Sequence, residues 1–128
     1  MQKAYILWAE DDEATFVFFS EKLQAYLEGQ GIVSEITRAV DGNAVFRHLS
    51  YSTTRYDVLL TDIVMPHFNG IDTVKELSKQ YPGLPMIIIS THTESEEYAS
   101  TLSELKEEKV IYGFFSTESG ETWFEATW

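Results

Sequence analysis

Short apolar runs alternate along this chain with longer segments in which apolar residues recur every three or four positions. A run that is apolar at almost every position is typical of a β-strand covered on both faces, whereas the longer recurrence predicts a helix with one buried face. Five segments are expected to be strands, at residues 4–9, 32–38, 57–61, 85–90 and 110–115, and the segment at 32–38 is the weaker one.

Helical spacing predicts four helices between these strands. They are residues 14–28, a short helix through Val45 and Leu49, residues 70–80, and a helix that buries Tyr98, Leu102 and Leu105. Asp41 is a candidate N-cap for the second helix. Thr93 and Glu96 have the spacing of a capping box, so the fourth helix is expected to begin near Thr93.

Five strands that alternate with four helices predict an α/β fold, in which helices cover both faces of a doubly wound, five-stranded parallel sheet. Right-handed crossovers place the carboxyl ends of the strands at one edge of such a sheet, where ligands bind. Functional side chains are therefore expected directly after the strands. The chain has 128 residues and 14.7 kDa, so residues 1–128 are expected to form a single domain.

The charge of the chain narrows the choice of partners. It has 9 basic and 21 acidic residues, which gives a formal net charge of −12. Because a phosphate backbone repels such a protein, we expect no direct binding of nucleic acid by this chain. The charge suits basic partner surfaces and divalent cations.

Two absences in the sequence exclude further classes of function. The chain contains no cysteine, which excludes disulfides, zinc-thiolate sites and thiol nucleophiles. No apolar run approaches the roughly 20 residues that a membrane helix needs, and the first residues lack the pattern of a signal peptide. A cytoplasmic location with no membrane association is the resulting expectation.

Carboxylates and hydroxyls follow three of the predicted strands. Glu10, Asp11 and Asp12 follow the first strand, Asp62 follows the third, and Ser90 and Thr91 stand at the end of the fourth. If these strand ends share one edge, three or four carboxylates converge there, and their mutual repulsion needs a cation or a shared proton. A hard divalent cation with oxygen ligands fits this need, and Mg²⁺ is the expected cofactor.

Three segments carry a resemblance to a known family: ILWAEDD, DVLLTDIVMPHFNGID and LPMIIIS. They resemble the receiver domains of bacterial two-component response regulators, over about Tyr5 to Phe115. The most specific element is an aspartate that ends an apolar strand and is followed three residues later by Met-Pro and then by Gly70. The resemblance implies a flavodoxin-like topology and a phosphoacceptor signalling domain rather than an enzyme.

The resemblance also implies roles for individual residues. Asp62 would be the nucleophile that accepts a phosphoryl group from a histidine kinase or a phosphotransfer protein. Glu10 and Asp11 would hold Mg²⁺ together with Asp62, and the backbone carbonyl of Val64 would complete the ligand set. Gly70 would shape the loop after the nucleophile by permitting positive φ.

A second group of residues would couple phosphorylation to a downstream protein partner. Ser90 matches the switch hydroxyl of the family, which bonds a phosphoryl oxygen, and Phe114 matches an aromatic side chain that changes rotamer. The lysine that usually ends the fifth strand is missing, and its position falls on Thr117, or on Ser116 with a slip of one residue. Losing such a charged hydrogen bond removes about 1.5–3 kcal/mol of stabilisation.

The end of the chain departs from the family in a second way. Residues 118–128 predict a shortened last helix, and Trp123, Phe124 and Trp128 would have to cover the edge that a full helix usually covers.

Each site residue also has a simpler structural interpretation. Glu10 and Asp11 would favour the start of a helix as negative charges, and Asp12 is a candidate N-cap of the first helix. Thr91 or Thr93 would cap a helix as well as Ser90. Phe114 would belong to the core, and the three histidines, His48, His67 and His92, would lie at the surface without metal-ligand spacing.

Three functions are consistent with these features. The first is a competent receiver phosphorylated on Asp62, which the intact acidic residues favour. The second is a degenerate receiver that acts as a phosphorylation-independent protein-interaction module, which the missing lysine favours. The third is a flavin-binding or hydrolytic enzyme on the same topology, although the sequence shows no flavin-phosphate loop and no base beside Asp62 to activate water.

Overall fold

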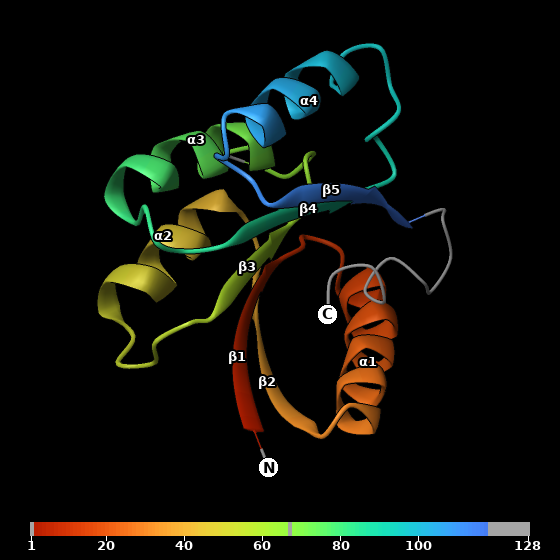
Figure 1. Cartoon of the computed structure of the whole chain (residues 1–128), viewed down its shortest axis with the longest axis vertical. Coiled ribbons are helices and arrows are strands. Elements are labelled where there is room, and N and C mark those ends of the chain that lie inside the picture. The colour runs from red at the N-terminus through yellow and green to blue at the C-terminus, as the bar shows by residue number, and fades with distance from the viewer. Residues whose placement is uncertain (1, 67, 118–128) are drawn as a thin grey trace.

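The computed structural model describes residues 2–66 and 68–117, with five strands and four helices among them (Figure 1). In chain order these are β1 (Gln2–Ala9), α1 (Glu13–Gly29), β2 (Ile32–Ala39), α2 (Gly42–Tyr51), β3 (Val58–Thr61), α3 (Gly70–Gln80), β4 (Met86–Ser90), α4 (Ala99–Glu107) and β5 (Gly113–Ser116). No helix in this described part is long and apolar enough to cross a membrane.

The five strands form one parallel sheet in the order β2-β1-β3-β4-β5, which confirms the predicted doubly wound α/β fold. The chain runs outward from β1 to β2 and then returns to continue in the other direction from β3. Ala9 is level with Ala39 on one side and with Thr61 on the other. The ends of the three strands therefore coincide at the point where the direction of winding changes.

Helices cover both faces of this sheet (Figure 1). One face packs against α1, and Ile6, Trp8 and Leu60 of the sheet share a buried cluster there with Leu23 and Leu27. The other face carries α2, α3 and α4, and its cluster is made by strand residues such as Leu7, Leu59 and Ile88 with helix residues such as Val45, Val74 and Leu102. Both faces of each central strand are buried, which explains why these runs are apolar at nearly every position.

Side-chain caps define the starts of the first three helices. Asp12 accepts a hydrogen bond from the Thr15 amide at 2.9 Å, which confirms its predicted role as the N-cap of α1. Asp41 does the same for α2 through the Ala44 amide at 2.7 Å. The N-cap of α3 is Asn69, which the sequence analysis did not single out. Each cap satisfies a backbone amide that the first helical turn leaves unpaired.

The fourth helix begins later than the predicted capping box implies. It starts at Ala99, and its N-cap residue Tyr98 makes no side-chain cap hydrogen bond. Thr93 is instead buried within a series of turns, in which the Ser95 amide bonds to the His92 carbonyl and the Tyr98 amide to the Ser95 carbonyl. These turns use the backbone groups that a helix beginning at Thr93 would need. Leu102 and Leu105 are buried as expected.

The fifth strand also differs in its start, which is Gly113 rather than residue 110. The amides of Val110 and Ile111 bond to the Leu105 carbonyl at the end of α4 and so belong to the helix terminus. Pairing with the sheet begins at Tyr112, whose amide donates to the Met86 carbonyl at 2.8 Å. The expected last helix at 118–128, with Trp123, Phe124 and Trp128, lies outside the described residues.

Candidate functional site

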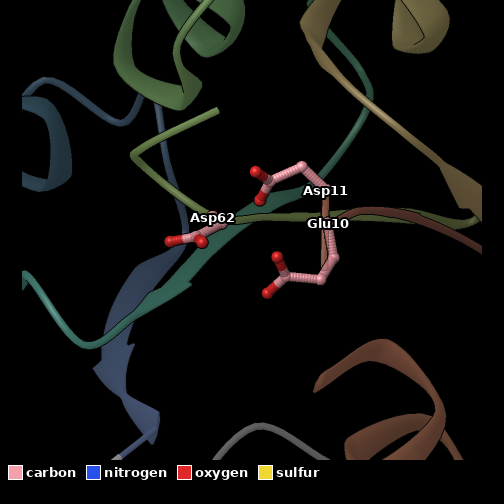
Figure 2. Close-up of side chains that lie close together, drawn as sticks. All are labelled: Glu10, Asp11 and Asp62. Atoms are coloured by element: carbon pink, nitrogen blue, oxygen red, sulfur yellow. The ribbon is translucent and has the colours of Figure 1, made fainter. Parts of the chain in front are cut away.

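Three carboxylates meet at the carboxyl edge of the sheet. Glu10 and Asp11 follow β1, and Asp62 follows the neighbouring strand β3. One oxygen from each side chain can be chosen so that all three lie within 4.8 Å of one another. Figure 2 shows the carboxylates of Glu10 and Asp11 reaching from the end of β1 toward Asp62. The structure therefore brings together the acidic residues that the strand pattern placed at one edge.

Backbone pairing holds this arrangement in place. The Asp62 amide donates to the Ala9 carbonyl at 3.1 Å, and the Glu10 amide donates to the Ala39 carbonyl at 2.9 Å. Both bonds extend the parallel ladders of the sheet beyond the last strand residues. The side chain of Asp62 is oriented by the Ile63 amide, which donates to its Oδ1 at 2.7 Å.

The environment of Glu10 favours its neutral form. Only 6% of the residue is exposed, and Oε2 accepts one hydrogen bond, from the Asp12 amide at 3.2 Å. Burial raises the pKa of Glu10 to about 8, and the negative charges of Asp62 and Asp11 add to the shift, although the Asp12 hydrogen bond opposes it. At neutral pH a cation-free site therefore holds a proton that an exposed glutamate would have lost.

Burial also raises the pKa of Asp62, and the negative charge of Asp11 contributes to the increase. Hydrogen bonds from the Ser90 hydroxyl and the Ile63 amide lower the pKa of Asp62, as does an electrostatic contribution from His92. Asp62 is thus a carboxylate whose charge is partly compensated by donors from the end of β4 and from the loop after β3.

The donor set fits a hard divalent cation. It consists of carboxylate oxygens on a rigid sheet edge, and the raised pKa values of Glu10 and Asp62 show that their negative charge is undercompensated without a cation. A divalent cation relieves this repulsion and prefers oxygen ligands.

A cavity of about 170 Å³ opens beside the acidic group. It is lined by Glu10, Asp11, Asp12, Thr15, Asp62, Ile89, Ser90, Thr91 and Thr117. Thr117, rather than Ser116, lines the cavity, which places an uncharged side chain where the family resemblance anticipates a lysine. This volume corresponds to roughly five waters, since one water occupies about 30 Å³ in the liquid.

The remaining predicted site residues occupy different environments. Ser90 is 2% exposed and ends β4, and its Oγ accepts a hydrogen bond from the His92 amide at 3.1 Å. Val64 lies two residues beyond Asp62 in the β3–α3 loop, with an exposed side chain. Phe114 is half-buried on β5 and packs against the core on the face covered by α2, α3 and α4.

Gly70 acts by a different physical means from the one expected. Its φ is not positive; of the glycines in the described ranges only Gly31 has a positive φ, of 80°. A Cβ on Gly70 would instead lie 1.9 Å from the Asp62 carbonyl oxygen. The Gly70 amide also donates to the Ile63 carbonyl at 2.8 Å. The missing side chain lets the start of α3 approach the backbone of the acidic loop.

The sequence pattern did not predict that Arg38 lies at the site. Arg38, near the end of β2, donates to the carbonyls of Glu10 and Asp11. Its position near the end of the strand next to β1 is the feature of the sequence that could have indicated this contact. His92 is exposed, as expected, and makes an electrostatic contribution that lowers the pKa of Asp62. His48 is half-buried on α2, and His67 lies outside the described residues.

The strand order and the acidic group at the change of winding define an α/β domain of the receiver class. The family model for the response regulator receiver domain matches residues 6–112. The chain belongs to this family, which confirms the resemblance carried by the three sequence segments and places the chain among proteins of two-component signal transduction.

Longer proteins of known function are similar to this chain in sequence. The DNA-binding transcriptional regulator NtrC of Salmonella typhimurium is 31% identical over 99 residues, which make up 77% of this chain and 20% of NtrC. The response regulator SaeR of Staphylococcus aureus is 33% identical over 94 residues, or 72% of this chain and 38% of SaeR. The chain thus spans about a fifth to two fifths of the length of these two relatives.

Solved structures agree on the fold. The response regulator TrrA of Thermotoga maritima, in complex with Mg(2+)-BeF, matches with a TM-score of 0.68 and 23% identity over 91% of this chain and 86% of that one. A receiver domain protein from Clostridium thermocellum matches with a TM-score of 0.68 and 21% identity, covering 88% of this chain and 81% of that one. These matches confirm the flavodoxin-like receiver topology.

Replacing Gly70 with alanine should disturb the acidic loop. A Cβ at 1.9 Å from the Asp62 carbonyl forces backbone to move, so we expect Gly70→Ala to lower the free energy of unfolding by about 1–3 kcal/mol. Urea denaturation measures this change. Gly83→Ala is the matched control, because nothing lies within 4 Å of a Cβ there. Equal stability of the two variants would contradict the close approach.

The raised pKa of Glu10 predicts a stability that falls as the pH rises. The folded chain keeps the Glu10 proton up to about pH 8, whereas the unfolded chain releases it near the ordinary value of 4.5. Between these values the unfolded state binds fewer protons, so raising the pH favours unfolding. Without divalent cations, Glu10→Gln should therefore lose less thermal stability from pH 6 to pH 9 than the unmodified chain, by about 4 °C or more.

Differential scanning calorimetry in buffers containing a chelator provides the measurement. Glu21→Gln removes the same charge from an exposed position on α1 and serves as the control. The interpretation is wrong if Glu10→Gln and Glu21→Gln show the same pH dependence.

Proposed function

We propose that this chain is a phosphate-accepting receiver in which Asp62 takes a phosphoryl group from a histidine kinase or a phosphotransfer protein, in a Mg²⁺-dependent reaction. The observation that carries the proposal is the convergence of oxygens from Glu10, Asp11 and Asp62 within 4.8 Å at the carboxyl edge of the sheet. The complex of the relative TrrA with Mg(2+)-BeF supports it by analogy.

All three acidic residues would bind the cation, and Asp62 would also be the nucleophile. Glu10, Asp11 and Asp62 would hold the cation, with the backbone carbonyl of Val64 as a further oxygen donor. A bound divalent cation supplies the charge neutralisation that lets two anions approach each other. Asp62 attacks phosphorus through a carboxylate oxygen; the new P–O bond forms as the P–N bond to the donor histidine breaks, and the electron pair returns to the imidazole nitrogen.

The surrounding residues would orient the carboxylate of Asp62 and respond to its phosphorylation. The Ile63 amide fixes one oxygen of Asp62, which aligns the carboxylate with the cavity. Ser90 lines the same cavity and would donate its hydroxyl proton to a phosphoryl oxygen. The β4–α4 segment and Phe114 would then change position, and with them the face presented to a downstream protein.

A second candidate function is favoured by Thr117. This uncharged residue lines the cavity where the family usually supplies a lysine, and without that charge the phosphorylated state is stabilised less. In this alternative the chain keeps the fold and acts as a phosphorylation-independent interaction module.

The setting of the chain forms the last part of the proposal. We infer a single receiver domain over residues 1–128 that works in the cytoplasm, with a kinase or phosphotransfer protein upstream and a protein partner downstream. The net charge of −12 supports protein partners with basic surfaces.

Beryllofluoride, a mimic of the phosphoryl group, distinguishes the two candidates. Trp8 is buried on β1, two residues before Glu10, and its fluorescence should report binding there. With Trp123 and Trp128 replaced by phenylalanine, Trp8 is the remaining tryptophan of the three. We expect a saturable change that requires Mg²⁺ and disappears in Asp62→Asn. No response in the chain that retains Asp62 would favour the interaction module.

Introducing a lysine at position 117 should stabilise the phosphorylated form of the chain. A charged hydrogen bond of about 1.5–3 kcal/mol corresponds to roughly a 10-fold to 100-fold longer lifetime or tighter beryllofluoride binding. We expect Thr117→Lys to show such a gain when phosphorylated chain is resolved on phosphate-affinity gels. Ser103→Lys adds the same charge at an exposed position on α4 and should show none. Equal gains in both variants would trace the effect to net charge.

A further inference from the structure

The side chain of Arg38 donates two hydrogen bonds to the loop that carries Glu10 and Asp11. Its Nε donates to the Glu10 carbonyl at 2.9 Å, and its Nη2 donates to the Asp11 carbonyl at 2.7 Å. Arg38 is the penultimate residue of β2, level with Trp8 of β1. One guanidinium therefore spans two consecutive peptide groups directly beyond the end of the neighbouring strand.

These bonds prolong the pairing of β1 with β2. The last paired residues of the two strands are Ala9 and Ala39, and the Glu10 amide still donates to the Ala39 carbonyl at 2.9 Å. Arg38 then supplies side-chain donors where the backbone of β2 has turned away toward α2. The backbone of residues 10–11 is thus bonded to β2 at three points.

The guanidinium bonds to the backbone of residues 10–11 and not to the carboxylates of Glu10 and Asp11. Within residues 2–66 and 68–117 Arg38 forms no ion pair with the side chain of Glu10 or Asp11, and its two side-chain hydrogen bonds there go to carbonyls. The carboxylates remain directed toward Asp62 (Figure 2). An arginine that served to neutralise them would instead donate to their oxygens.

We propose that Arg38 is a positioning residue for the cation site: its two-pronged contact fixes the peptide groups of Glu10 and Asp11, so that both carboxylates leave the loop in the direction of Asp62. The proposal rests on the proposed function, because it assumes that the acidic group binds a divalent cation. Outer contacts that orient metal ligands commonly change metal affinity by about 10-fold to 100-fold when they are removed.

Charge and positioning predict changes of opposite sign, which makes the proposal testable. Arg38 is a positive charge close to a cation site, so its electrostatic effect alone weakens cation binding, and its removal would tighten it. If Arg38 positions the ligands, its removal must weaken binding in spite of this gain. Lysine keeps the charge but has one ammonium group and cannot reproduce the planar fork.

The experiment titrates the full chain with Mn²⁺ and follows the free ion by electron paramagnetic resonance. We expect the Kd for Mn²⁺ to rise about 10-fold in Arg38→Gln, and to rise also in Arg38→Lys. Arg47→Gln is the matched control, because Arg47 is exposed on α2 and its replacement changes the net charge equally. Arg47→Gln should bind Mn²⁺ as tightly as the unmodified chain, or slightly more tightly.

Each other result is decisive. Unchanged or tighter binding by Arg38→Gln overturns the positioning role, and so does an Arg38→Lys variant that binds as tightly as the unmodified chain. Circular dichroism at the titration temperature establishes that the variants are folded, and Arg38→Lys decides the question if Arg38→Gln does not fold. If the unmodified chain binds no Mn²⁺, the proposed function fails along with this inference; if only the Arg38 variants behave differently from expectation, this inference alone fails.

Discussion

Electrostatic repulsion between carboxylates is the constraint on which the site depends. Glu10, Asp11 and Asp62 hold oxygens within 4.8 Å of one another, an arrangement that separate chains in water would avoid. The sheet opposes this repulsion through backbone bonds that run from β1 to both of its neighbours. Burial raises the pKa values of Glu10 and Asp62, the neighbouring negative charges add to the increase, and a cation or a proton relieves the repulsion.

The same backbone bonds connect the site to the core. β1 and β3 are buried on both faces, and α1 packs against one side while α2, α3 and α4 pack against the other. The apolar clusters stabilise the strands, and the strands place polar groups at their ends, where the packed layers stop. Burial therefore provides the rigidity that a cluster of like charges requires, and it also raises the pKa of the carboxylates by removing water from them.

The fold could be predicted because its central strands are apolar on both faces and its helices are apolar on one face only. The acidic edge followed from the strand ends, and the Asp12 and Asp41 caps from local spacing. The late start of α4 could not be predicted, because turns after β4 use the backbone groups that the apparent capping box would need. Arg38 was missed because its contacts depend on the register between β1 and β2. The role of Gly70 was missed because it depends on how closely α3 approaches the backbone of Asp62.

The segment between β4 and α4 is incompletely satisfied in its hydrogen bonding. α4 begins without a side-chain cap, and the buried hydroxyl of Ser95 has no hydrogen-bond partner among residues 2–66 and 68–117. The segment is tied to Ser90 through the His92 amide. The start of α4 is therefore not fixed by a side-chain cap, and a shift of this start along the chain would break no such hydrogen bond.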